Sequence, residues 1–292
     1  MATTTAGMPV ATAAPRPNAA WTWVRRNKTI VGGVMILLAF LVIALLAPML
    51  AGDPLQFEPT DRLKRPSDQF WFGTDQFGRD VYSRVVYGTR ISLIIGFSVA
   101  VLATFIGLVV GVLCGFYRPV DAIMMRVMDG MMAIPAILLA IALITLMKAS
   151  LTIVIIAIAI PEIPRVARLV RSVVLSVRAR PYIEAAVASG TRNGRIMVRH
   201  ILPNTVAPLI VQATYVCASA ILTEAGLSFL GAGTPPEIPS WGNIISLGRT
   251  YFQIAPWIIF FPGVMLAITV LAINLVGDGL RDSLDPRISR RM

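Results

Sequence analysis

Residues Ile30 to Leu50 read IVGGVMILLAFLVIALLAPML, a run of 21 residues without a charged side chain. A helix rises about 1.5 Å per residue, so about 20 apolar residues cross the roughly 30 Å hydrocarbon core of a bilayer. The run is longer than the roughly 7–15 residues of a signal-peptide core. We therefore interpret it as an uncleaved membrane span, and Arg25 and Arg26 before it as topology determinants rather than a twin-arginine signal.

Five further apolar stretches follow in this chain of 292 residues, of which 56% are hydrophobic and 14% charged. They are Ile91–Phe116, Ile123–Met147, Leu151–Ile163, Val206–Leu230 and Pro256–Gly277. The span at Leu151–Ile163 is short and ends among prolines, and Pro135 and Pro262 are expected to kink their helices. The sequence therefore predicts an all-α integral membrane protein with six transmembrane helices.

Positive charge predicts the orientation of these helices, because cytoplasmic loops carry the excess of Lys and Arg. With the N-terminus inside, the cytoplasmic segments hold 18 of the 26 Lys and Arg and the outer segments hold 8. Both termini are therefore expected in the cytoplasm. The net charge of +11 is interpreted as a topology signal, in preference to nucleic-acid binding.

The spans divide the chain into five predicted parts. These are a disordered cytoplasmic tail (1–24), the first transmembrane helix (25–50), an extracytoplasmic loop (51–90), a five-helix core with a cytoplasmic loop at 181–204 (91–280), and a cytoplasmic C-terminal tail (281–292). The outer loop is long enough to form a small structured cap. Within it, Asp80 and Arg84 are spaced to pair if a helix begins near Arg79, and a solvated helix face without that pair is an equal alternative.

Small residues recur every fourth position in the second span, at Ala103, Gly107, Gly111 and Gly115. This spacing lines them along one helix face, where another helix can approach closely. The stripe predicts helix packing and no further function.

Polar residues inside spans are costly in lipid and often mark a transport pathway. Asp129 is expected to face headgroups or to pair with Arg126. Glu224 and Asn274 are our pathway candidates, and for Glu224 a structural pairing is an equal alternative.

The sequence lacks the residues that several kinds of catalysis and ligand binding require. None of the three lysines follows a glycine, so the chain has no P-loop to bind a nucleotide. A single histidine and two cysteines, Cys114 and Cys217, give neither a nucleophile–base arrangement nor a metal-ligand set. No catalytic residue, metal site or bound cofactor is therefore assigned to this chain.

One basic segment interrupts the apolar blocks, YIEAAVASGTRNGRIMVRHILPN at Tyr182–Asn204. Pro181 suits a helix start, Gly190 can end that helix, and Arg195 through Leu202 can form a second one before Pro203. The sequence predicts a short helix, a turn and another short helix. The small alanine side chains of the first helix would let a partner approach its backbone closely.

This segment resembles the cytoplasmic EAA loop of permease subunits of ABC importers, through EAA at 184–186, Gly190 and Leu202-Pro203. The family's usual Ile three places before that proline is His200 here, a form that resembles the peptide-transporter branch. FGTDQFGRDVYSRVVYGTRISL at 72–93, LTEAGLSFLGAGTPPEIPSWG at 222–242 and NLVGDGLRDSLDPR at 274–287 are similar to C-type permeases of dipeptide/oligopeptide ABC importers.

The resemblance implies that this loop couples the permease to an ATPase. The residues carried over are Glu184, Ala185, Ala186, Gly190, His200, Ile201, Leu202 and Pro203. It also implies a second homologous permease, two ATPase subunits or domains that bind ATP and Mg, an extracytoplasmic peptide-binding protein, and alternating access in a bacterial cell membrane.

Rival interpretations stay open at this stage. The same kind of machine carries nickel or a metal chelate, and such permeases share these motifs. A channel, a secondary transporter or an intramembrane enzyme is a rival from another class. For the loop itself, a basic segment lying on anionic lipid is the alternative.

Overall fold

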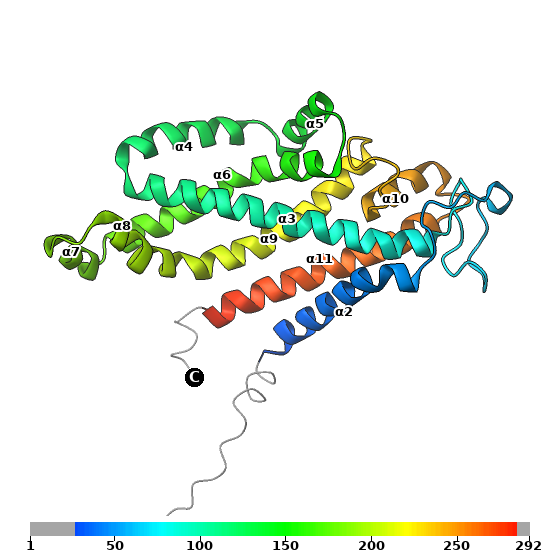
Figure 1. Cartoon of the computed structure of the whole chain (residues 1–292), viewed down its shortest axis with the longest axis horizontal. Helices are drawn as coiled ribbons and strands as arrows, with labels where there is room; N and C mark the ends of the chain where they lie inside the picture. The colour runs from blue at the N-terminus through cyan, green and yellow to red at the C-terminus, as the bar shows by residue number, and fades with distance from the viewer. Residues whose placement is uncertain (1–26, 285–292) are drawn as a thin grey trace, which may run out of the picture.

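The computed structural model describes residues 27–284, which form helices, turns and loops with one isolated bridge between Thr74 and Asp80. The expected disordered tail (1–24) and most of the expected C-terminal tail lie outside these residues. The helices are α2 (Lys28–Leu50), α3 (Val81–Phe116), α4 (Arg118–Ala133), α5 (Ala136–Met147), α6 (Leu151–Arg178), α7 (Pro181–Ala188), α8 (Asn193–Ile196), α9 (Leu202–Phe229), α10 (Trp241–Gly248) and α11 (Trp257–Leu284). The long helices form a bundle with α7 and α8 at one end and α10 at the other (Figure 1).

The all-helical membrane fold is confirmed for the described residues. Three helices, α2, α3 and α11, and the continuous segment Asn193–Phe229 are each long and apolar enough to cross a membrane, and the bent pair α4–α5 makes a fifth if it is one span. α6 is long enough as well, but several arginines follow Pro164 in its second half. The count of six spans and the side on which the termini lie stay predictions.

The predicted kinked span at Ile123–Met147 consists of two helices, α4 and α5, which meet at an angle of 91°. Pro135 clashes with a helical residue before it, and Ile134 accordingly has an extended backbone. The kink predicted at Pro135 is therefore a complete break between two helices.

The fourth apolar stretch, placed at Leu151–Ile163, belongs to a longer helix than the sequence indicated. α6 runs through Pro161 and Pro164 and ends at Arg178. It packs along α3 over much of its length, and close neighbours of this kind let a helix tolerate prolines.

α3 begins ten residues before the predicted span, so the outer loop is shorter than expected and ends at Asp80. The Asp80 carboxylate accepts hydrogen bonds from the backbone N–H groups of Tyr82 (3.2 Å) and Ser83 (3.0 Å) and caps the helix. The predicted pair with Arg84 is wrong, because this cap uses the carboxylate and the Arg84 side chain lies instead 3.9 Å from Asp75.

The glycine stripe packs against another helix as predicted, and that helix is α6. A Cβ at Gly107 would lie 2.5 Å from Val166, and one at Gly115 would lie 2.6 Å from Val174. Distances this short leave no room for a side chain, so these positions fix how closely α3 approaches α6.

Candidate functional site

The basic segment predicted as a coupling loop folds into α7 and α8 at one end of the bundle (Figure 1). Pro181 occupies the first turn of α7, where its missing N–H costs no hydrogen bond. Gly190 ends the helix with φ +76, while its N–H donates to Val187 O (2.9 Å) and that of Thr191 donates to Ala186 O (3.1 Å). This pair of bonds is the Schellman arrangement, so the turn has one defined geometry.

Three isoleucines anchor this loop to the bundle. Ile183, Ile196 and Ile201 are 3%, 0% and 0% exposed, and all three belong to the main hydrophobic core. Fully burying such a side chain contributes roughly 1.5–3 kcal/mol. Motion of the loop as a unit is thereby linked to the helices beneath it.

The predicted coupling residues divide between an outer and an inner set. Glu184, Ala185, Gly190 and Pro203 are exposed, whereas Ala186, His200 and Leu202 are half-buried and Ile201 is buried. The first set is the more accessible to a partner. Ile201 belongs to the anchor just described.

Two exposed apolar side chains here were not singled out from the sequence. Val187 is 58% exposed on α7 and Val198 is 68% exposed on the turn that follows α8. Val187 therefore adds exposed apolar surface to the helix that carries the alanines. The available signal was a second branched apolar residue on α7 one turn after Ile183, of which the structure buries only Ile183.

The predicted second helix does not stop before Pro203. A π-helical turn, Met197–Ile201, connects α8 to α9 without interruption, and the N–H of Leu202 donates to Met197 O. The wider turn precedes Pro203, and such turns accommodate an irregularity inside a continuous helix. The loop therefore continues directly into α9 on one side, and on the other side Ala179 and Arg180 separate it from α6.

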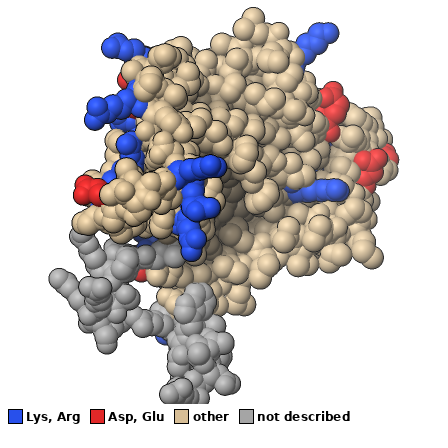
Figure 2. Space-filling model, turned by 60° about the vertical axis from the view of Figure 1, so that its left-hand side comes forward, with Lys and Arg blue, Asp and Glu red and all other residues tan. Residues whose placement is uncertain are grey.

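The charges around the loop are positive. Arg180, Arg192, Arg195 and Arg199 are exposed, against the single carboxylate of Glu184 on α7. Figure 2 shows Lys and Arg side chains gathered on the side of the molecule that carries this end. A partner that docks here meets exposed arginines together with the exposed apolar side chains of Val187 and Val198.

The first pathway candidate, Glu224, is 1% exposed in α9. Its Oε1 accepts hydrogen bonds from Ser228 Oγ (2.8 Å), Ser240 Oγ (2.7 Å) and Thr234 Oγ1 (3.4 Å). Ser240 in turn caps α10 by accepting from the N–H of Asn243 (3.1 Å). These bonds tie the segment after α9 to α10, and a pathway role for Glu224 stays a prediction.

The second pathway candidate, Asn274, is exposed on α11 and its role is likewise a prediction. Asp129 pairs with Arg168 of α6 (2.5 Å) rather than with Arg126. A second ion pair joins the same helices, since Arg171 donates to both carboxylate oxygens of Asp121 at 2.5 and 2.6 Å. The two pairs fasten α4 to α6.

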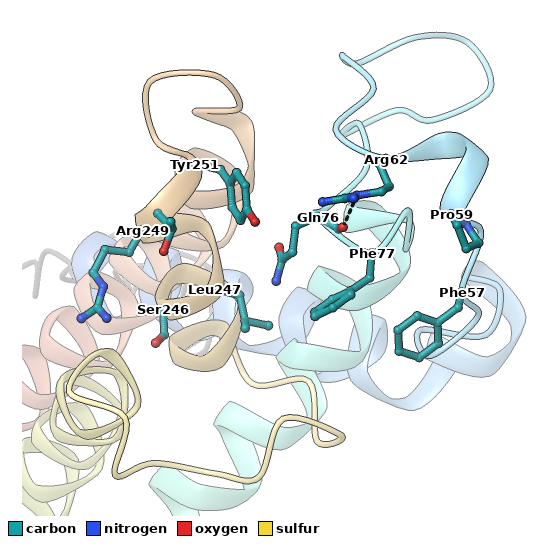
Figure 3. Close-up of a pocket in the computed structure, with 10 residues that line it drawn as sticks. Phe57, Pro59, Arg62, Gln76, Phe77, Ser246, Leu247, Arg249 and Tyr251 are labelled. Carbon is teal, nitrogen blue, oxygen red and sulfur yellow. Dashed lines mark hydrogen bonds between the residues drawn. The ribbon is translucent and has the colours of Figure 1, made fainter.

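A pocket of about 580 Å³ opens at the other end of the molecule, and we call it the cap pocket. Figure 3 shows its two walls, the loop that precedes α3 and the segment of α10 and the turn after it. Its lining residues are Phe57, Pro59, Arg62, Gln76, Phe77, Ser246, Leu247, Arg249, Thr250 and Tyr251.

Several helices long and apolar enough to cross a membrane, packed in one bundle, define a multi-pass membrane protein. Residues 103–290 match the family described as "Binding-protein-dependent transport system inner membrane component", and the chain belongs to that family. Residues 18–66 match the "N-terminal TM domain of oligopeptide transport permease C". The protein is therefore a multi-pass membrane protein and a permease subunit of the ABC importer class.

Relatives cover nearly the whole chain. It is 55% identical over 267 residues to a probable peptide ABC transporter permease of Sinorhizobium fredii, covering 91% of this chain and 92% of the relative. It is 46% identical to a dipeptide transport system permease of Alkalihalophilus pseudofirmus, covering 90% and 88%. A chain in a solved inward-facing structure of the MetNI methionine ABC transporter is similar to this protein, with a TM-score of 0.58 and 25% sequence identity. The matched region covers 69% of this chain and 96% of that chain.

Proposed function

We propose that this chain forms half of a translocation pathway for di- and oligopeptides, together with a second homologous permease. The cargo is inferred from the names of the relatives, which describe peptide and dipeptide permeases at 55% and 46% identity. Two ATPase subunits or domains bind ATP and Mg and supply the energy. The chain itself hydrolyses nothing, and an extracytoplasmic binding protein delivers the peptide.

The observation that carries the mechanism is the anchored projection of α7 and α8. Its outer face offers Glu184, Ala185 and Val187, and its inner face is buried in the core. The small alanine side chains leave the helix backbone accessible, so the helix can fit into a groove of a partner. A push on α7 is transmitted to α6 and, through α8 and the π-helical turn, to α9.

Alternating access follows if the ATPases contact the two permease states differently, because a ligand shifts an equilibrium only by its differential affinity. Closure of the ATPases around ATP would favour the outward-open state through this loop. In this account the loop is cytoplasmic, both termini share its side, and the cap pocket faces outward.

Uptake by cells tests the proposal. Strains with and without this chain, at matched expression of the neighbouring transporter subunits, are given labelled dipeptides, tripeptides and nickel in separate assays. We expect peptide uptake to disappear and nickel uptake to stay unchanged. Loss of nickel uptake alone would show that the cargo is nickel and not a peptide. Unchanged uptake of all three substrates would contradict the proposed function.

A further inference from the structure

We propose that the cap pocket receives a protruding loop of the extracytoplasmic peptide-binding protein. The loop would present an apolar side chain, a backbone N–H and a neighbouring carboxylate. This inference rests on the proposed function and adds to it a specific docking point. It follows from the rigidity, the polar groups and the charge of the pocket.

One wall of the pocket is a tightly fixed turn. The Asp75 carboxylate accepts from the N–H groups of Phe77 (2.8 Å) and Arg79 (3.0 Å) and from Arg79 Nε (2.7 Å). Gly78 has φ +77, and a Cβ there would lie 1.8 Å from Glu58 O. Only glycine fits, so the turn holds Gln76 in place before any partner arrives.

The opposite wall is fixed from within the bundle. Trp241 at the start of α10 is fully buried, and its indole N–H donates to Val85 O (3.1 Å). The hydroxyl of Ser240, itself bonded to Glu224, caps the same helix. Both walls are therefore preorganised, which lowers the entropic cost of binding.

Gln76 carries an unused hydrogen-bond acceptor. The residue is 7% exposed, and its Oε1 has no partner among the described residues. In Figure 3 its side chain reaches from the loop toward Leu247 and Tyr251 of the other wall. A buried acceptor without a donor is costly, and an incoming backbone N–H would satisfy it.

The rest of the lining defines the partner. Phe57, Phe77 and Leu247 give the pocket an apolar side, and Phe57 and Phe77 are 58% and 43% exposed in a segment outside the spans. Exposed apolar surface of this kind marks interaction sites. An apolar side chain of the partner would fill this side.

The charges select an acidic partner. The lining holds two arginines and no carboxylate. Arg249 is engaged, because it donates to Phe229 O (3.0 Å). Arg62 is exposed and donates through Nε to Gln76 O (2.8 Å), which aligns its guanidinium beside the pocket for a carboxylate.

Titration of ATP hydrolysis tests the inference in the complete transporter reconstituted in vesicles. The titrant is the purified binding protein that supports uptake with the native chain. Gln76→Leu should raise the concentration for half-maximal stimulation roughly fivefold, as expected for the loss of one hydrogen bond, and leave the maximal rate unchanged. Gln69→Leu, on the same loop outside the pocket, is the matched control and should titrate like the native chain.

Labelling of a single introduced cysteine identifies the occupant, and it does not depend on how well Gln76→Leu assembles. Thr250→Cys lies in the exposed lining of the pocket. A membrane-impermeant maleimide should label it in the assembled transporter, and the binding protein should protect it. Protection by free dipeptide alone would make the pocket a cargo site, and absence of labelling before any addition would mean that another subunit covers it. Either result overturns the inference.

Failure of this inference is distinguishable from failure of the proposed function. If the native transporter is stimulated by the binding protein but Gln76→Leu titrates identically, only the docking point is wrong. If peptide uptake does not depend on the chain at all, the proposed function itself is wrong.

Discussion

Gly190 permits a quantitative test of the proposed coupling role of the loop, because its substitution changes backbone energy and little else. Its φ of +76 is unfavourable for a residue with a Cβ, yet a Cβ added there would meet nothing within 4 Å. The left-handed conformation costs a non-glycine residue about 1–2 kcal/mol. That free energy corresponds to a roughly 5–30-fold loss in the ratio of the ordered to the disordered turn.

The chain provides a matched control four residues away. A Cβ at Gly194 would also meet nothing within 4 Å, but Gly194 does not have a left-handed φ. Gly194→Ala should be neutral or stabilising, since alanine favours the helix by roughly 0.5–1 kcal/mol over glycine. At Gly190, asparagine tolerates positive φ better than alanine, and valine tolerates it worst.

The assay measures peptide uptake and ATP hydrolysis in the same reconstituted vesicles. We expect uptake per ATP to fall in the order glycine, asparagine, alanine, valine at position 190, with Gly194→Ala close to the native chain. Equal coupling in Gly190→Ala and Gly190→Val would refute the reasoning. So would an equal loss in Gly194→Ala, because position and not conformation would then matter.

Three further predictions concern the bundle. Gly111→Leu should lower the melting temperature of the purified transporter, because overpacking at the α3–α6 contact costs about 1–3 kcal/mol. Gly130→Leu is the control and should leave the melting temperature unchanged, because a Cβ at Gly130 would meet nothing within 4 Å. Equal melting temperatures of the two variants would contradict the close α3–α6 packing. Asp121→Asn should destabilise more than Asp129→Asn in the same melting assay, because Asp121 accepts two bonds and is less exposed; the reverse order would contradict this. Glu224→Leu removes the acceptor of two buried serine hydroxyls, which costs about 1–3 kcal/mol for each hydroxyl. This variant should therefore lose both peptide uptake and thermal stability. Glu224→Gln should keep its thermal stability, and it should lose uptake only if Glu224 lines the pathway. Native stability in Glu224→Leu would show that the hydroxyl network is unimportant.

The sequence predicted features that depend on local periodicity. The glycine stripe of α3, the helix after Pro181 and the turn at Gly190 all follow from residues close together in the chain. Their geometry is set by steric limits on the backbone, which a single sequence reveals directly. The all-helical membrane fold follows similarly from the length of the apolar runs.

The sequence did not predict features that depend on contacts between distant residues. α6 passes through Pro161 and Pro164 because α3 packs beside it, and hydropathy alone placed its end at Ile163. Arg84 was expected to pair four residues back, but tertiary packing brings Asp75 closer. The cap pocket joins residues almost 200 positions apart, so no local pattern could have indicated it.

Site-specific photo-crosslinking from α7 tests the central claim most directly. A photoreactive amino acid replaces Val187, whose side chain is 58% exposed on the outer face of the loop, and Phe105, which is 65% exposed on α3, carries the same probe as the control. Irradiation of native membranes should join position 187, and not position 105, to an ATPase subunit. Crosslinking of position 187 to lipid alone would contradict the account, because the loop would then lie on the membrane surface and could not transmit ATP-driven closure.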